Sequence, residues 1–246
     1  MDRRSFLERA AKGLAAGLLV PASSHFQTRH VILIVQSGAR KKDYCENPSI
    51  APNIGQLAAE GFVFEEDDCD TVTSHHSSFA ELVHGLPDCL YAGDATRVPA
   101  LMQEFKPRIL VVRETRHDLG HGAGGRPKSI SGYEEYRTVV KDTDRNAGAI
   151  MQWLRRDPYF SSNTAIVIRP EFGRDDEINV FGELHHSPGF YYTHRVASIF
   201  WGPDFNTGVD RKTVVNRRDM APTLSRLLNL GTMRPRGRVL PGLFKA

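Results

Sequence analysis

Four short apolar runs, separated by stretches with helical character, constrain the fold of this chain most. The runs cover residues 31–35, 108–113, 164–168 and 196–201 and are rich in Val, Ile and Leu. The first run is continuously apolar, as expected of a strand that is covered on both faces. Strands of this kind belong to sheets that pack against helices on each side.

Helical patterns occupy the intervals between these runs. Residues 51–61 place Pro52 near the start and Gly61 at the end, as short helices do. The other predicted helices are 77–84, 97–105, 133–156 and 219–228, and 62–64 is a further short strand. The alternation predicts one α/β domain with a mostly parallel or mixed central sheet and helices on both faces.

Binding sites on such sheets gather at the carboxyl ends of the strands. The loops that follow Val35, Val112 and Ile168 are therefore the first places to look for functional residues.

The N-terminus has the pattern of an export signal. Arg3 and Arg4 precede a short stretch rich in Ala and Gly, and Val20-Pro21-Ala22 offers a small-residue cleavage site. Twin-arginine signals have this organisation, and the apolar run is too short to span a membrane. A basic amphipathic N-terminal helix is the alternative interpretation. We expect a leader at 1–22, a mature domain at 23–246, export machinery as a transport partner, no stable membrane anchor, and a periplasmic or secreted location.

Charge and cysteine content limit the possible functions. The formal net charge of the 246 residues is +3, and four basic and two acidic residues of the leader supply +2 of it. No basic stripe with interleaved aromatic residues is present, so nucleic acid is not expected as a partner. Cys45, Cys69 and Cys89 lack the spacing of a zinc finger; in an exported protein two of them could pair.

Five segments, in a fixed order, carry a resemblance to a known family. They are residues 31–40, similar to a strand ending in Asp-Gly; 49–64, similar to TPNLDRLAAEGVRF; 71–87, similar to a nucleophile helix ending LLTGLYP; 164–173, similar to a strand ending in SDHG; and 195–203 with 219–224, similar to RVPLIIWGP followed by DLAPTL. Together they resemble the alkaline phosphatase/sulfatase superfamily, whose members hydrolyse phosphate or sulfate esters with bound metal. The resemblance implies an alkaline phosphatase-like fold.

The metal-ligand pattern of that superfamily is altered here. Ser37 stands where the resemblance implies the first aspartate, and it cannot supply a negative ligand. Glu171 and Phe172 correspond to the Asp-His of SDHG; Glu171 can still bind a metal and Phe172 cannot. The resemblance therefore implies that one metal position is weakened or lost.

A second metal position follows from the PDxxGHxxGP pattern of phosphodiesterase-like members. His117 lies at the aspartate position of that pattern, Asp118 beside it is a further candidate ligand, and His121 matches the histidine of the pattern. His185 or His186 lies where the family has a distal histidine, before the fourth strand. Three neutral imidazoles suit zinc, with calcium or manganese as alternatives. Exposed loop histidines bonded to backbone are the competing interpretation.

The nucleophile has three candidates. Alignment on Gly85 puts His75 at the position of the family's Cys or Thr, and a shift of one or two residues would bring Ser74 or Thr73 there instead. If His75 occupies the position, covalent hydroxyl chemistry is excluded at that point. Both hydroxyls are also good helix N-caps.

Other charged residues near expected strand ends have two interpretations. Arg40 and Arg169 are candidates to bind an anionic group, and structural salt bridges are the competing explanation. The acidic run 65–68 and the charged run 174–177 are expected to be solvated loops.

Two functions remain open. The first is an exported hydrolase of phosphate or related anionic (sulfate) esters that uses one divalent metal, with a small anionic ester as substrate and Ser74 or water on the metal as attacking group. The second is a superfamily member that no longer turns over substrate and binds an anion, a glycan or a protein. Ser37 and Phe172 favour the second function, and the clustered histidines favour the first. The hydrolase requires imidazoles from distant stretches of chain to converge beside the tip of the first strand.

Overall fold

The computed structural model describes residues 26–69, 73–86, 89–121, 131–231 and 236–245. The expected leader at 1–22 lies outside these residues. In the described chain, no helix combines the length and the apolar character needed to cross a membrane.

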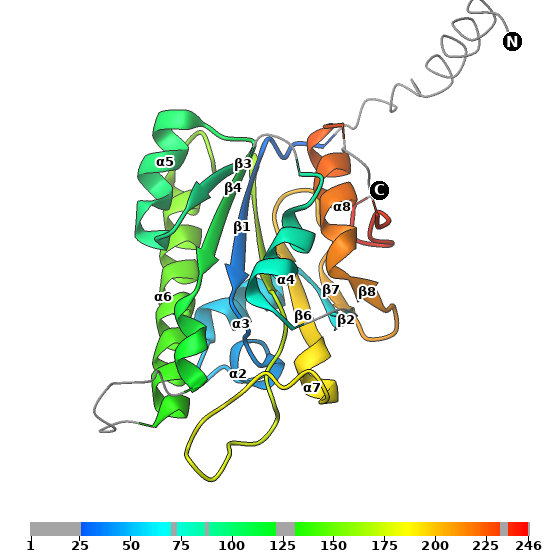
Figure 1. Cartoon of the computed structure of the whole chain (residues 1–246). Helices are drawn as coiled ribbons and strands as arrows, with labels where there is room; N and C mark the ends of the chain where they lie inside the picture. Colours follow the sequence, from blue (N-terminus) through cyan, green and yellow to red (C-terminus); the bar gives the residue numbers. More distant parts are fainter. Residues whose placement is uncertain (1–25, 70–72, 87–88, 122–130, 232–235, 246) are drawn as a thin grey trace, which may run out of the picture.

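A mixed sheet of eight strands forms the centre of the described chain (Figure 1). The order along the sheet is β3-β4-β1-β5-β6-β2-β7, and β8 also pairs with β2. The strands are β1 (His30–Gln36), β2 (Phe62–Asp68), β3 (Cys89–Ala92), β4 (Ile109–Glu114), β5 (Thr164–Pro170), β6 (Arg195–Trp201), β7 (Gly208–Asp210) and β8 (Val215–Asn216).

All strands of the described sheet except β6 point their carboxyl ends toward the same edge, because β7 and β8 are parallel to β2. Strands β3, β4, β1 and β5 are parallel, and β6 is antiparallel to both β5 and β2. Strand β2 therefore runs in the direction of β1. The segments that follow β1, β2, β4 and β5 all leave the sheet at this carboxyl edge.

Helices cover both faces of the sheet, and this confirms the predicted α/β class (Figure 1). Ile32 and Ile34 of β1 belong to the core that includes residues of α3 (Pro52–Glu60), α5 (Val98–Phe105) and α6 (Gly132–Arg156). Val31, Leu33 and Val35 belong to the core on the other face, with residues of α4 (His75–Val83) and α8 (Met220–Leu228). Successive side chains of a strand point to opposite faces, so a continuously apolar strand serves both cores.

The predicted elements match the observed ones closely. The predicted short strand at 62–64 extends to Asp68 as β2, and three strands, β3, β7 and β8, were not predicted. Two short helices, α2 (Lys41–Tyr44) and α7 (Tyr191–His194), lie at the carboxyl edge, at the lower end of the view in Figure 1. Three 3₁₀ segments, η1 (Ala95–Arg97), η2 (Arg116–His121) and η3 (Arg217–Asp219), complete the described elements.

Cys45, Cys69 and Cys89 all lie in the described part of the chain, and no disulfide joins any of them there. Cys69 is buried, while Cys45 and Cys89 are half-buried. The pairing considered from the sequence is therefore not formed in this structure. Burial raises the pKa of the Cys45 thiol to about 12, which keeps it protonated and unreactive at neutral pH.

Candidate metal centre

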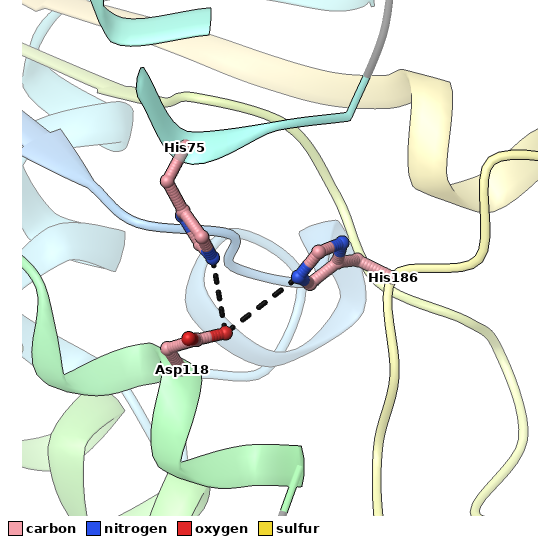
Figure 2. Close-up of side chains that lie close together, drawn as sticks. All are labelled: His75, Asp118 and His186. Carbon is pink, nitrogen blue, oxygen red and sulfur yellow. Dashed lines mark hydrogen bonds and ion pairs between the residues drawn. The ribbon is translucent and has the colours of Figure 1, made fainter. Parts of the chain in front are cut away.

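Three side chains from separate segments converge at the carboxyl edge (Figure 2). His75 is the first residue of α4, Asp118 lies in η2 after β4, and His186 lies in the loop between β5 and α7. The atoms that these residues can offer to a metal all lie within 4.8 Å of one another. Ser37, the first residue after β1, places its Oγ atom 3.0 Å from His75 Nδ1, so the cluster stands at the tip of the first strand.

One carboxylate oxygen is the centre of this cluster. Asp118 Oδ1 lies 3.0 Å from His75 Nε2 and 3.6 Å from His186 Nε2. It also lies 3.4 Å from His121 Nε2 and 3.5 Å from Arg174 Nη2. The interactions with His186 and then with His75 hold the pKa of the Asp118 carboxyl well below its usual range. Asp118 is therefore an ionised oxygen donor at neutral pH.

His75 faces acidic groups on both sides of its ring. Nδ1 lies 2.9 Å from Glu171 Oε2, and Nε2 lies 3.0 Å from Asp118 Oδ1. Burial lowers the pKa of His75, but the hydrogen bonds to the two carboxylates outweigh it and raise the pKa to about 9. The ring is consequently an imidazolium at neutral pH unless a cation replaces its proton.

Glu171 orients His75 from the side opposite Asp118. It follows β5 directly and is fully buried. Its Oε1 accepts a 2.7 Å bond from Arg113 Nε, and Arg113 Nη2 donates to the backbone oxygen of His75 at 3.0 Å. Arg113 was not expected as a site residue, although it ends a predicted strand whose following loop is one of the expected site loops. Glu171 lies outside the three-residue group, so its contacts fit a positioning role better than a ligand role.

The two altered positions of the superfamily pattern both contact this cluster. Phe172 is fully buried, and its ring centroid lies 4.8 Å from His75 and 4.6 Å from His186. Gly38 has φ +75°, and a Cβ atom there would lie 2.7 Å from Phe172 Cε2. Glycine is required for this turn, which lets Phe172 pack against the two imidazoles. Ser37 and Phe172 hold the cluster in place without adding charge.

His121 and His185 differ in whether their rings face the cluster. Among the described residues, the buried His121 Nε2 atom has no hydrogen-bond partner, and the ring lies 4.5 Å from His186 and 4.6 Å from His185. Burial, and then the nearby Arg174, lower the pKa of His121 to about 4. His185 Nε2 instead lies 3.0 Å from Glu183 Oε2. His121 therefore faces the cluster as a neutral ring, whereas His185 contacts a different carboxylate.

His117 is a core residue in this structure. It is fully buried, and Nδ1 lies 3.3 Å from the backbone oxygen of Glu114. Burial lowers its pKa to about 4. It is outside the three-residue group, and its neighbour Asp118 is the member of η2 that joins it.

Of the three nucleophile candidates, His75 is the one whose side chain points into the cluster. Ser74 precedes α4, and its side chain makes no capping hydrogen bond. Thr73 is buried and donates from Oγ1 to the backbone oxygen of His186 at 3.2 Å.

Arg40 and Arg169 are held in buried salt bridges. Arg40 Nε lies 2.7 Å from Asp43 Oδ2. Arg169 is fully buried, and its Nε donates to Asp67 Oδ2 at 2.8 Å. These contacts favour the structural alternative over anion binding. They also correct the expectation of a solvated run at 65–68, because Asp67 is only 1% exposed.

Arg174, which the sequence analysis placed in a solvated run, is fully buried behind the cluster. Its guanidinium donates to the backbone oxygens of Gly38 at 2.6 Å and of Leu184 and His117 at 2.7 Å. It therefore ties together the loops that follow β1, β4 and β5. Nothing in the sequence alone distinguishes this buried arginine from an exposed one in a charged run.

The donors of the cluster suit a divalent cation. Two imidazoles and one carboxylate are a common ligand set for zinc, and an open fourth position is typical of catalytic sites. The buried, unpartnered Nε2 atom of His121 supplies a further nitrogen close to Asp118. The residues present therefore fit a metal ion.

Comparison with known proteins identifies the fold. No protein-family profile and no curated protein matches the chain. A candidate sulfatase from Bacteroides thetaiotaomicron matches 87% of this chain and 74% of its own at 12% identity, with a TM-score of 0.64. BT4656, solved in complex with its substrate D-glucosamine-2-N,6-O-disulfate, matches 87% of this chain and 79% of its own at 9% identity, with a TM-score of 0.67.

A third solved structure extends the same similarity. The lipoteichoic acid synthase LtaP from Listeria monocytogenes matches 93% of this chain and 79% of its own at 11% identity, with a TM-score of 0.61. The class is therefore an α/β protein with the alkaline phosphatase/sulfatase fold. Within that class, this chain has Ser37 and Phe172 at two positions where the superfamily pattern has ligands.

Proposed function

We propose that this protein is a metal-dependent hydrolase of phosphate or sulfate esters. The observation that carries the proposal is the convergence of His75, Asp118 and His186 at the carboxyl edge of the sheet. The fold supports it, because solved structures of this fold include a sulfatase candidate and a protein in complex with a sulfated sugar substrate. An anionic ester is accordingly the expected substrate.

His75, Asp118 and His186 would hold the cation, with zinc the first choice and calcium or manganese the alternatives. A divalent cation supplies positive charge that stabilises the ester oxygens as the bond to the leaving group breaks. Glu171 accepts the Nδ1 proton of His75 and so directs the Nε2 lone pair of that ring toward the site.

Water is the attacking group in this proposal, because the resemblance puts His75 at the nucleophile position and the Thr73 hydroxyl donates to the backbone oxygen of His186. Water adds its oxygen to phosphorus or sulfur, and the bond to the alcohol oxygen breaks. The departing alcohol takes up a proton, and the water gives up one. The Nε2 atom of His121, which lies 3.4 Å from Asp118 Oδ1, would accept a hydrogen bond from that water. Phe172 keeps bulk water away from one side of the imidazoles.

Metal content combined with turnover tests this proposal. The mature form, purified without a histidine tag, is analysed for zinc, manganese and calcium and assayed with aryl phosphate, phosphodiester and aryl sulfate esters. We expect one metal per chain and hydrolysis of at least one ester, both lost in His186→Ala. His76→Ala is the matched control, because His76 is an exposed histidine next to His75 on α4.

A binding protein without turnover is the second candidate. Ser37 and Phe172 favour it, since these residues fill two former ligand positions with a hydroxyl and an apolar ring. Metal-free protein that hydrolyses none of the esters would select this candidate and exclude the hydrolase.

We also propose export by the twin-arginine route, on the pattern of residues 1–22. Replacing Arg3 and Arg4 together with Lys keeps the charge and removes the arginine pair. The wild type is expected in the periplasm or medium and the double variant in the cytoplasm on cell fractionation. Equal fractionation of the two proteins would exclude this route.

A further inference from the structure

A cavity lies at the carboxyl edge, and its lining residues are separate from those of the metal centre. It has a volume of about 180 Å³ and is lined by residues of α2, β2, α7 and the start of β6, together with Asp176. Tyr191 and Tyr192 form one wall, so we call it the tyrosine pocket. It is smaller than the roughly 300–1,000 Å³ of pockets for drug-sized ligands, so it suits a single ring.

The two tyrosines form a corner of exposed aromatic surface. Tyr191 is 59% exposed and Tyr192 is 53% exposed. Their ring centroids are 5.7 Å apart with an interplanar angle of 80°, so the rings stand almost perpendicular. The Arg195 guanidinium lies 5.0 Å from the centroid of the Tyr191 ring and makes a cation–π contact with it. An aromatic corner of this kind offers a flat surface against which a ring with CH groups can pack.

The charges around the tyrosine pocket are balanced. Four basic and four acidic side chains line it. Lys42 pairs with Asp176, Lys41 Nζ lies 3.3 Å from Glu46 Oε1, and Arg195 Nη1 lies 2.8 Å from Glu66 Oε2. Because each cation already has a carboxylate, a free anion gains little there. The same groups offer many charged hydrogen-bond donors and acceptors to a neutral ligand with several hydroxyls.

The pocket and the metal centre share their supporting chain segments. The loop after β1 carries Ser37 and leads to α2, and the loop after β5 carries Glu171, Asp176 and His186 before reaching α7. Lys42 Nζ donates to the backbone oxygen of Asp176 at 2.8 Å, which joins the two segments. Helices α2 and α7 accordingly stand at the same end of the molecule in Figure 1.

From these observations we infer that the tyrosine pocket binds a sugar ring. Aromatic surface together with dense, charge-balanced donors and acceptors matches a polyhydroxylated ring and neither a purely apolar molecule nor a free anion. We further assign this sugar as the alcohol part of the ester, or as a neighbouring unit of it; that part of the inference rests on the proposed hydrolase function.

Binding is tested first without any ester. The probes are methyl glucoside, methyl galactoside, methyl mannoside and methyl N-acetylglucosaminide, with acyclic sorbitol as the control that lacks a ring, and binding is followed by saturation-transfer NMR of the full mature chain. At least one glycoside is expected to bind and sorbitol is not. Tyr192→Ala is expected to weaken binding by about tenfold, and Tyr192→Phe to retain it, because the ring supplies the contact.

Tyr91→Ala is the matched control, since Tyr91 is 54% exposed on β3 and outside the tyrosine pocket. It should bind the glycosides as the wild type does. Absence of binding by every glycoside, or equal binding by wild type and Tyr192→Ala, would overturn the sugar site.

Turnover separates this inference from the proposed function. Glucose 6-phosphate and glucose 6-sulfate are compared with p-nitrophenyl phosphate and sulfate, and Tyr192→Ala is expected to raise KM for the sugar esters only. Hydrolysis of the aryl esters with no glycoside binding refutes the sugar site and leaves the hydrolase standing. Glycoside binding without hydrolysis of any ester supports the sugar site and refutes its assignment to an ester substrate.

Discussion

Glu171→Gln tests whether the contacts between Arg113, Glu171 and His75 order the metal centre. The carboxylate accepts a 2.7 Å bond from Arg113 and lies 2.9 Å from His75 Nδ1, and it is fully buried. A glutamine keeps one acceptor oxygen but presents an NH₂ donor to the other partner, which is also a donor. Loss of one charge-assisted hydrogen bond costs about 1.5–3 kcal/mol, so we expect the free energy of unfolding to fall by about 2–3 kcal/mol.

The same substitution should weaken metal binding. A ligating histidine is oriented by the group that binds its other ring nitrogen, and loss of that group lowers metal affinity by about 10- to 100-fold. Zinc affinity is measured by competition with a chromogenic chelator, and stability by urea unfolding followed by circular dichroism. Glu183→Gln is the matched control, because that carboxylate contacts His185. It should keep the zinc affinity of the wild type.

Two results would refute this reasoning. Wild-type zinc affinity in a destabilised Glu171→Gln protein would show that the carboxylate supports the fold without orienting His75. Wild-type affinity together with wild-type stability would show that the buried contacts contribute nothing measurable.

Three further predictions follow from individual contacts. Because the pKa of His75 is raised to about 9 in the folded protein, the protonated ring stabilises the fold fully below about pH 6.5, and this stabilisation is lost as the pH rises through 9. In chelator-treated protein, urea unfolding should show a loss of about 2 kcal/mol across that range after allowing for solvent screening. The His75→Gln variant should not show this pH-dependent loss. Asp144→Ala removes the acceptor of two 2.7 Å hydrogen bonds, donated by the backbone N–H of Ile54 at the start of α3 and by Asn53 Nδ2, so thermal and urea unfolding should show a loss of about 2–3 kcal/mol. Asp144→Asn keeps one acceptor oxygen and should lose about half as much. Gly38→Ala forces a Cβ atom against Phe172 at a positive φ and should cost about 1–3 kcal/mol and weaken zinc binding; unchanged zinc affinity would show that Phe172 does not hold the imidazoles in place.

The strands and helices that form the core were predictable because their residue patterns are local. Residues 31–35 are apolar at every position, and they form a strand whose side chains enter both cores. The strands that the sequence missed are short, such as Val215–Asn216, or carry no clear alternation, such as Cys89–Ala92. Such strands are defined by their pairing with neighbours, which lie far away in sequence.

The location of the candidate metal centre was also predictable, and so was part of its membership: Asp118 and His186 were candidate ligands, whereas His75 was a candidate catalytic residue. The loops after Val35, Val112 and Ile168 do carry Ser37, Asp118, Glu171 and His186, because parallel strands bring their carboxyl ends to one edge. The sequence offered His117 as a ligand alongside Asp118 as its neighbour, and only the turn of η2 buries the first and directs the second toward His75 and His186.

By itself the sequence determined the α/β class and the carboxyl edge as the place to look for a site, because these follow from residue type and local periodicity. The uncharged residues Ser37 and Phe172 stand out only through the resemblance to the superfamily pattern. Only the tertiary structure determines which partner each buried charged side chain contacts. Arg169 pairs with Asp67 of another strand, and Arg174 binds three backbone oxygens in the interior. The physical reason is that a buried charge must find a partner within a few ångströms, and only packing of distant segments determines which partner is there.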